Sequence, residues 1–295
     1  MKPVYKIFFY ISMALTVMAV VLVIVFGLRL GVDFKGGSVL EVSFDSARPS
    51  VQELNDTVRE VAGVGDVNIS PAGDTGALLR MGEIDEETHQ AVLQAVSAKY
   101  GEITENRFDS VGPTIGNELR GKSITAIIVL LLVVIIYIAI VFRKLSGVLS
   151  PWAMGFAAIA ALIHDVIVPI GLFAYLGHYF GVEITAVFVA AALTILGYSI
   201  ADSVVIFDRV RENILRFGVK DKFAEVVHKS VLQTLVRSIN TTLTTLIPLA
   251  AIFFFGGDSI KYFALALMVG IFSGSYSSIF IASPILVWLS GRRHR

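Results

Sequence analysis

Six runs of uncharged, mainly apolar residues constrain this chain more than any other feature of its sequence. A run of about 18 or more such residues is long enough to cross the hydrocarbon core of a bilayer as a helix. The six runs cover residues 7–28, 123–142, 151–175, 184–207, 238–255 and 262–289. Only 16% of the 295 residues are charged, which is low for a soluble chain of this length. The sequence therefore predicts an α-helical polytopic membrane protein with six transmembrane helices.

The polar segment 30–121 interrupts the membrane pattern and is long enough to form a small domain. Alternating apolar residues predict strands at 39–44, 66–70, 77–81 and 103–109, with a turn at 71–74. Ser50 and Glu53 have the spacing of a helix capping box, and a second helix is expected at 85–100, ended by Gly101. The resulting order, βαββαβ, is that of an α+β ferredoxin-like domain.

These predictions divide the chain into a first transmembrane helix at 7–29, the domain at 30–121 and a five-helix transmembrane domain at 122–291. The last part contains a cytoplasmic amphipathic loop at 208–236. Two short amphipathic helices separated by Gly218 are expected there. The loop could be an interfacial connector packed on lipid headgroups, or a docking surface for a cytoplasmic partner.

The distribution of positive charge predicts the orientation in the membrane, because basic residues in short loops stay cytoplasmic. If the six spans alternate, one side collects Lys2, Lys6, Arg143, Lys144, Arg209, Arg211, Arg216, Lys220, Lys222, Lys229, Arg292, Arg293 and Arg295. Both termini are therefore expected in the cytoplasm, and the domain between the first two spans outside it. The first span has no small-residue cleavage site and is expected to remain as an anchor in the lipid bilayer.

The fourth apolar run contains a carboxylate, Asp202, that costs about 2.5–3.5 kcal/mol to place at the centre of a membrane helix. Tyr198 and Thr194 precede Asp202 by four and eight residues, so they are expected on the same face of the helix. The third run is interrupted in the same way by His164 and Asp165. Ionisable residues inside membrane spans are expensive, so these positions are candidates for function.

The fifth run supplies a permanent positive charge, Arg237, at its cytoplasmic end. A stripe of polar residues that supports it consists of Asn240, Thr241 and Thr244. Arg237 would favour the anionic form of Asp202 and desolvation would oppose it, so the carboxylate could take and release a proton. Arg237 could instead extend to the membrane interface, with Asp202 capping an apolar run and His164 a core residue.

The rise of a helix gives the expected depths of these groups. Counted from the cytoplasmic ends of the apolar runs, Asp165 lies at about 21 Å, Thr194 at about 20 Å and Asp202 at about 8 Å. Thr194 and Tyr198 would then bridge about 12 Å between the level of Asp165 and that of Asp202. The six residues Asp202, Arg237, Asp165, His164, Tyr198 and Thr194 form the predicted proton pathway. A row of small residues in the sixth run, which contains Gly270 and Gly274, is interpreted as packing.

The sequence contains no motif typical of nucleotide binding, zinc binding or nucleophilic catalysis. The chain lacks a phosphate-binding loop, an H-E-x-x-H zinc motif, a G-x-S-x-G nucleophile motif and any cysteine. The formal net charge is zero, which gives no electrostatic reason to expect a nucleic-acid partner. We therefore expect a transport protein rather than an enzyme, with protons as coupling ions and no other cofactor or metal.

Six motifs resemble those of the SecD/SecF family, membrane proteins of bacterial protein export that are related to the resistance-nodulation-division transporters. They are GVDFKGG (31–37), SVGPTIGNEL (110–119), ALIHDV (161–166), LTILGYSIADSVVIFDRVREN (193–213), TLVRSINTTLTT (234–245) and GSYSSIFIASP (274–284). The resemblance places the family's intramembrane Asp at Asp202 and its Arg at Arg237, both regarded as part of the proton pathway. Ala201 stands where the family usually has Asn, and Lys35 is a milder departure.

The resemblance also implies a function. Such chains pair with a SecD-like subunit and act on the SecYEG channel of the bacterial cytoplasmic (inner) membrane, after SecA has threaded the translocating polypeptide. They use the proton gradient to promote export of secreted polypeptides. One alternative is half of a proton-driven small-molecule or lipid exporter of the same superfamily. Another is a passive scaffold, which would not need Asp202 and Arg237.

Overall fold

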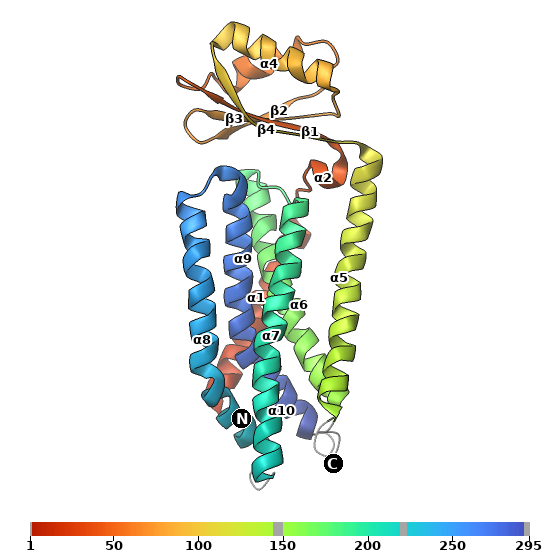
Figure 1. The fold of residues 1–295 in the computed structure, drawn as a ribbon, viewed down its shortest axis with the longest axis vertical. Helices are drawn as coiled ribbons and strands as arrows, with labels where there is room; N and C mark the ends of the chain where they lie inside the picture. The colour runs from red at the N-terminus through yellow and green to blue at the C-terminus, as the bar shows by residue number, and fades with distance from the viewer. Residues whose placement is uncertain (1, 144–149, 219–222, 292–295) are drawn as a thin grey trace. The chain divides into compact units, whose positions relative to one another are not determined.

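The computed structural model describes residues 2–143, 150–218 and 223–291, and the chain forms two compact units (Figure 1). The first contains residues 1–28, 125–182 and 187–295, and the second residues 29–124 and 183–186. Several basic residues used to predict the orientation lie outside the described residues. They are Lys144, Lys220, Lys222, Arg292, Arg293 and Arg295.

The described residues include six helical spans long and apolar enough to cross a membrane. They are α1 (Pro3–Phe26), α5 (Pro113–Val141), α6 (Pro151–Phe180), α7 (Ala186–Phe217), α8 (Phe223–Phe255) and a last span made of α9 (Asp258–Ser277), the π-helix η2 (Ser278–Ala282) and α10 (Ser283–Gly291). The prediction of a multi-pass helical membrane protein is confirmed. The helices extend beyond several apolar runs because a helix continues through its charged ends as readily as through its apolar middle.

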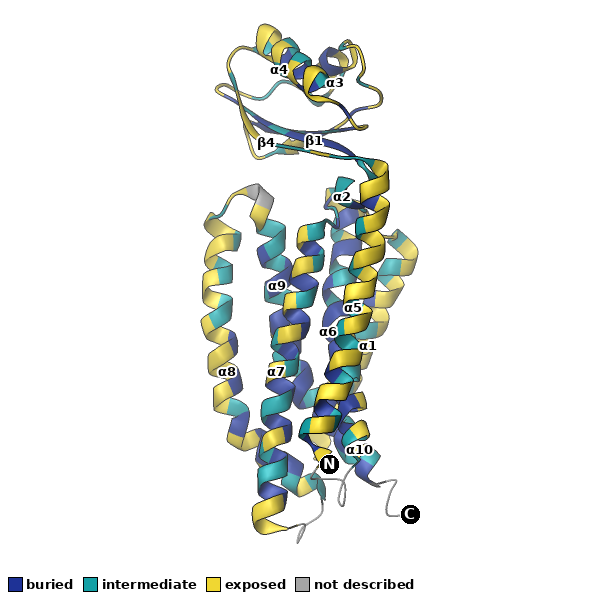
Figure 2. Ribbon diagram, turned by 45° about the vertical axis from the view of Figure 1, so that its right-hand side comes forward, coloured by how far each residue is buried: buried dark blue, intermediate teal, exposed yellow. Residues whose placement is uncertain are grey.

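Burial separates the spans into inner and outer ones. Within the most apolar window, 56% of the residues are buried in α6 and 61% in the last span, against 11% in α1, α5 and α8. Figure 2 shows exposed residues along α5 and α8, and many of them are large and apolar, such as Ile136 and Phe254. An apolar outer surface of this kind suits a lipid environment.

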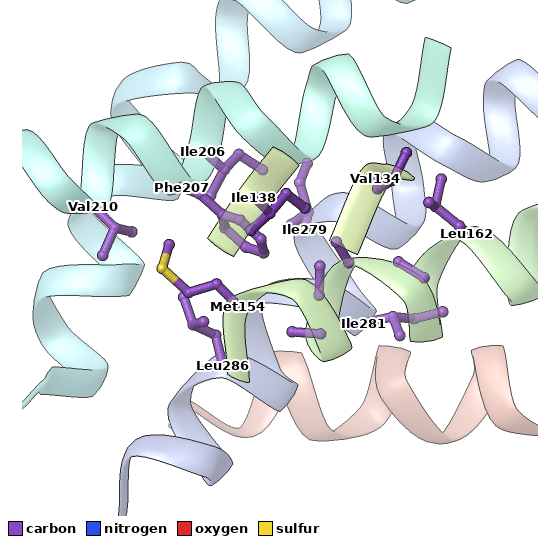
Figure 3. Packing of buried hydrophobic residues seen from close by; sticks show 14 of the residues in the cluster. Val134, Ile138, Met154, Leu162, Ile206, Phe207, Val210, Ile279, Ile281 and Leu286 are labelled. Carbon is purple, nitrogen blue, oxygen red and sulfur yellow. The ribbon is translucent and has the colours of Figure 1, made fainter. Parts of the chain in front are cut away.

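The core of this unit packs side chains from helices that are distant in the sequence. Figure 3 shows Ile138 of α5, Met154 of α6, Phe207 of α7 and Ile279 of η2 within one cluster. At Gly171 of α6, an added Cβ would lie 2.5 Å from Ala19 Cα of α1, so this glycine sets the distance between the two helices.

The segment 208–236 differs from its prediction. Its described residues continue α7 to Phe217 and begin α8 at Phe223, and Gly218 has φ +65°. Val210 and Val227 are buried in the same core as the membrane helices. The buried face of the amphipathic pattern therefore packs into this core, whereas contact of the exposed face with lipid headgroups or with a cytoplasmic partner stays a prediction.

The second unit contains a four-stranded antiparallel sheet in the order β2-β3-β1-β4. Its elements are α2 (Val32–Lys35), β1 (Gly37–Phe44), α3 (Val51–Arg59), β2 (Asn68–Ala72), β3 (Gly76–Met81), α4 (Glu86–Tyr100) and β4 (Ile103–Val111). Leu40 and Leu79 form an opposed pair in the central strands and pack with Leu54 of α3 and Val92 of α4. One face of the sheet is thereby covered by the two longer helices.

The sequence misplaced one turn of this unit. Residues 71–74 were predicted to form it, but Pro71 and Ala72 belong to β2, and the chain turns at Gly73, where φ is +63°. Proline lacks the backbone donor that a central strand needs, but β2 lies at the edge of the sheet and tolerates it.

The predicted capping box of α3 is present: Ser50 Oγ accepts from Glu53 N at 3.2 Å, and Ser50 N donates to Glu53 Oε2 at 3.0 Å. These bonds from Ser50 lower the pKa of Glu53 below 4.5, and the backbone N–H of Thr88 lowers the pKa of Asp85 at the N-cap of α4. A depressed folded-state pKa contributes stability above the unfolded value that is lost as pH falls through the folded one.

We predict that Ser50→Ala destabilises the isolated fragment 30–121 by about 1 kcal/mol at neutral pH. The loss should shrink as pH falls below 4.5, because protonation removes much of the same Ser50–Glu53 interaction in the parent fragment. Thermal unfolding followed by circular dichroism at several pH values measures both effects. A loss that stays constant down to pH 3 would contradict this account of the capping box.

Candidate functional site

Asp165 lies at the middle of α6 and is completely buried. Its Oδ2 accepts hydrogen bonds from Ser199 Oγ of α7 at 2.5 Å and from Ser277 Oγ of α9 at 2.7 Å. Its Oδ1 lies 3.2 Å from Ser273 Oγ, which donates to it, and 2.9 Å from His164 Nδ1. Two helices, α7 and α9, therefore direct hydroxyl groups at one carboxylate of α6, which offsets the cost of burying it.

Asp202 lies on α7, is only 9% exposed and has a different partner. Ser238 Oγ of α8 donates a hydrogen bond to Asp202 Oδ2. The same hydroxyl lies 3.3 Å from Ser275 Oγ of α9, where either atom can be the donor. A hydroxyl group both donates and accepts, so this chain can reorient when the carboxyl group gains or loses a proton.

Helix α9 presents serines to both carboxylates, and it packs against α6 on one side and α8 on the other (Figure 1). Ser273 and Ser277 are four residues apart and face Asp165, whereas Ser275 lies on the opposite side of the helix, toward Ser238. The π-helix Ser278–Ala282 follows directly, a feature that often occurs near functional sites.

Two glycines bring α9 close enough to α7 for these contacts. An added Cβ would lie 2.9 Å from Ser199 Cβ at Gly274 and 2.2 Å from Ile195 Cδ1 at Gly270. Such distances leave no room for a side chain. The interpretation of this row as close packing is confirmed at both positions.

The predicted difference in depth between the two carboxylates was wrong. Ser199, which contacts Asp165, precedes Asp202 by one helical turn, so the axial distance between the two levels is about 5 Å rather than 12 Å. The estimate treated the end of the apolar run as the end of the helix, whereas α7 continues to Phe217. Asp202 is therefore much deeper in its helix than the apolar run indicated.

Thr194 and Tyr198 do not bridge the two carboxylates in this structure. Thr194 is exposed and its hydroxyl bonds to Ala190 O of its own helix at 2.8 Å. The Tyr198 hydroxyl is buried and has no hydrogen-bond partner among the described residues. Steps of four residues overshoot one turn by about 40°, so Thr194 lies about 80° around the helix from Asp202. Ser199, three residues from Asp202, is the residue of α7 that reaches Asp165.

Arg237 is exposed on α8, and within the described residues it forms no ion pair with Asp202. It lines a cavity of about 490 Å³ together with Val204, Val205, Asp208, Arg209, Glu212, Gln233 and Thr234. The predicted stripe beside it is also exposed: the Thr241 hydroxyl bonds to Arg237 O, and the Thr244 hydroxyl bonds to Asn240 O, both within α8 itself. Ser238, the neighbour of Arg237, is the residue that contacts Asp202.

The sequence analysis found both buried aspartates but missed the serines that bind them. The run SGSYSS at 273–278 was a usable signal for a polar site. Four of its six residues are serines, although it lies within an apolar span. His164 was recognised, and its Nε2 is buried with no partner among the described residues. No group of three or more His, Asp or Glu side chains in the described part of the chain is placed to hold a metal ion.

Comparison with known proteins identifies the family. The model described as protein export membrane protein SecD/SecF, C-terminal, matches residues 91–292, which is more than half of the chain. This chain belongs to the SecD/SecF family. The model of the SecD/SecF GG motif matches residues 21–47, which include the glycines of GVDFKGG. The resemblance seen in the sequence motifs is thereby confirmed.

Relatives in the SecD/SecF family match nearly the whole chain. It is 42% identical to a protein named protein translocase subunit SecF from Thermobaculum terrenum, over 95% of this chain and 90% of that protein. It is 43% identical to the protein of the same name from Anaerolinea thermophila, over 96% and 92%.

Solved structures give the same result. The crystal structure of SecDF from Thermus thermophilus matches 99% of this chain at 33% identity with a TM-score of 0.82. SecDF in its super-membrane-facing form matches 98% at 31% identity with a TM-score of 0.69. This chain spans 38% of the length of each SecDF chain.

Proposed function

We propose that this chain is an auxiliary subunit of the Sec protein translocase that uses the proton motive force, together with a SecD-like subunit, to promote polypeptide export. The observation that carries the proposal is the pair of buried carboxylates, Asp165 and Asp202, each hydrogen-bonded to serine hydroxyls of neighbouring helices. Chains of carboxylate and hydroxyl groups inside membrane spans are typical of proton relays. The names of the relatives favour export over the transport of small molecules or lipids.

The proposal assigns a role to each polar residue. Asp202 takes up and releases the proton. The hydroxyl groups of Ser238 and Ser275 reorient when the Asp202 carboxyl group gains or loses that proton. Asp165 and His164 form the second proton-accepting site, and the Ser199 hydroxyl joins this site to α7. Arg237, which lines the cavity together with Val204 and Asp208, biases the Asp202 carboxyl group toward its anion without pairing with it, and no cofactor other than the proton is required.

A row of small residues on the exposed face of α7 suits the SecD-like partner. The row consists of Ala190, Thr194, Gly197 and Ala201. Small residues let helix backbones approach closely in lipid, and the longer SecDF chains contain a second part that could supply the opposing helix. Thr194 and Tyr198 would then contribute to proton transfer at the junction of the two subunits.

The rest of the assembly follows from this role. The protein would lie in the bacterial cytoplasmic membrane with both termini in the cytoplasm. The βαββαβ unit would be a ferredoxin-like domain on the outer side, near the polypeptide that emerges from SecYEG after SecA has acted. The positive residues at one end of the spans support this orientation.

The proposal is tested by proton flux into vesicles that contain this chain and its SecD-like partner. We predict that Ser199→Ala lowers the proton flux about tenfold, because Asp165 loses its hydrogen bond from the Ser199 hydroxyl of α7. Tyr198→Phe in the same vesicles tests the subunit junction separately, since the Tyr198 hydroxyl has no partner among the described residues of this chain. If Tyr198→Phe slows the flux and Ser199→Ala does not, the path runs along the subunit junction instead.

A further inference from the structure

The motif GVDFKGG has no part in the proton site, and its contacts indicate a separate role. Residues just before and within it pair with the segment that precedes α7: Gly31 N donates to Ile184 O at 2.9 Å, and Ile184 N donates to Arg29 O at 2.7 Å. Asp33 Oδ2 then accepts a hydrogen bond from the backbone N–H of Ala186 at 2.7 Å. Ala186 is the first residue of α7, so Asp33 caps this helix from a distant part of the sequence.

An ion pair joins the same segment to the sheet. Arg80 Nε of β3 lies 2.9 Å from Glu183 Oε1, and both side chains are only 19% exposed. Residues 183–186 accordingly belong to the same compact unit as the sheet, although the rest of α7 belongs to the other unit. Partial burial shields this pair from solvent and salt, so it is stronger than an ordinary surface pair.

The glycines of the motif let the start of α5 lie against it. Gly36 has φ +79°, and an added Cβ there would lie 2.7 Å from Pro113 Cα. An added Cβ on Gly116 would lie 3.0 Å from Gly36 N. The two motifs GVDFKGG and SVGPTIGNEL thus form one junction in which side chains are excluded by close backbone contact.

We propose that Asp33, Arg80 and Glu183, here named the outer clamp, are positioning residues that couple the βαββαβ domain to α7 during proton-driven export. The inference rests on the proposed function and adds to it a route by which the state of Asp202 reaches the domain. Asp202 follows Ala186 by 16 residues, or about 24 Å along a continuous helix. A carboxylate at a helix N-terminus binds otherwise unpaired N–H groups and opposes the helix dipole, so the clamp holds this end of α7 firmly.

The coupling is measured as the amount of polypeptide exported per proton that enters vesicles containing the complex. Asp33→Ala is expected to lower this ratio about fivefold while proton flux persists, because the cap that ties α7 to the domain is removed. Asp33→Asn keeps an oxygen that accepts the Ala186 N–H and should retain most of the coupling. Asp74→Ala, at an exposed turn of the same domain, is the control and should not change the ratio.

The ion pair allows a test by exchange of charge. Glu183→Arg places two positive charges together and should lower the ratio, and adding Arg80→Glu should restore it. A purely structural role for these residues predicts instead that flux and export fall in proportion to the amount of folded protein. That proportional fall, or an unchanged ratio in both Asp33→Ala and Glu183→Arg, overturns the proposal.

A cross-link distinguishes a permanent clamp from one that opens. This chain contains no cysteine of its own, and Leu30→Cys and Ile184→Cys place two cysteines opposite each other in a parallel bridge. Oxidation should restore coupling to Asp33→Ala, and a block of export by the same cross-link in the parent chain overturns the proposal. Asp202→Asn in the same vesicles reports separately on the proton pathway: unchanged flux there refutes the proposed function, whereas the export ratio of the clamp variants still reports on the clamp.

Discussion

Asp202→Asn is expected to insert and fold normally but to lose proton-driven export by about 100-fold, the scale on which removal of a proton-transferring group acts. The amide oxygen of asparagine can still accept the hydrogen bond from Ser238, so the packing of α7 against α8 is retained. The amide does not take up a proton at physiological pH, so the path loses its central carrier. Export and proton flux are measured in vesicles with an imposed proton gradient.

Asp208→Asn is the matched control for this experiment. Asp208 lies on the same helix, but its side chain is 53% exposed and pairs with Arg211. We expect export to change less than twofold, because an exposed pair of this kind contributes little. Export at the parental rate in Asp202→Asn would show that protons do not pass through this carboxyl group.

Asp165→Ala is expected to have the largest effect on stability, lowering the free energy of unfolding in detergent micelles by about 3 kcal/mol. The substitution removes the acceptor for Ser199, Ser273 and Ser277 and the partner of His164 in the centre of the bundle. Each of these buried groups then lacks a partner or must turn to its own helix backbone. Denaturant titration followed by tryptophan fluorescence measures the change.

The same substitution at Asp208 provides the comparison. Asp208→Ala removes an exposed carboxylate from α7 and should change the free energy of unfolding by less than about 0.5 kcal/mol. A loss of under 1 kcal/mol for Asp165→Ala would mean that the serines do not depend on this carboxylate. Asp165 would then be a relay group without a structural role.

The sequence by itself determined the features that depend on local chemistry. Apolar length identified all six spans, because every backbone group in lipid must be bonded within the helix. Ser50 and Glu53 identified the start of α3, since a capping box involves only four consecutive residues. Asp165 and Asp202 stood out for a similar reason: a carboxylate in an apolar run is visible without knowing its neighbours.

Only the tertiary structure decided which groups meet those carboxylates. Serine is small and common, and whether Ser199, Ser238 or Ser277 faces an aspartate depends on the rotation and depth of helices far apart in the sequence. The apolar pattern did not show that α7 continues to Phe217, so the predicted depth of Asp202 was in error. Asp33 capping Ala186, 153 residues away, is likewise a contact that exists only once the chain has folded, because no local pattern links the two.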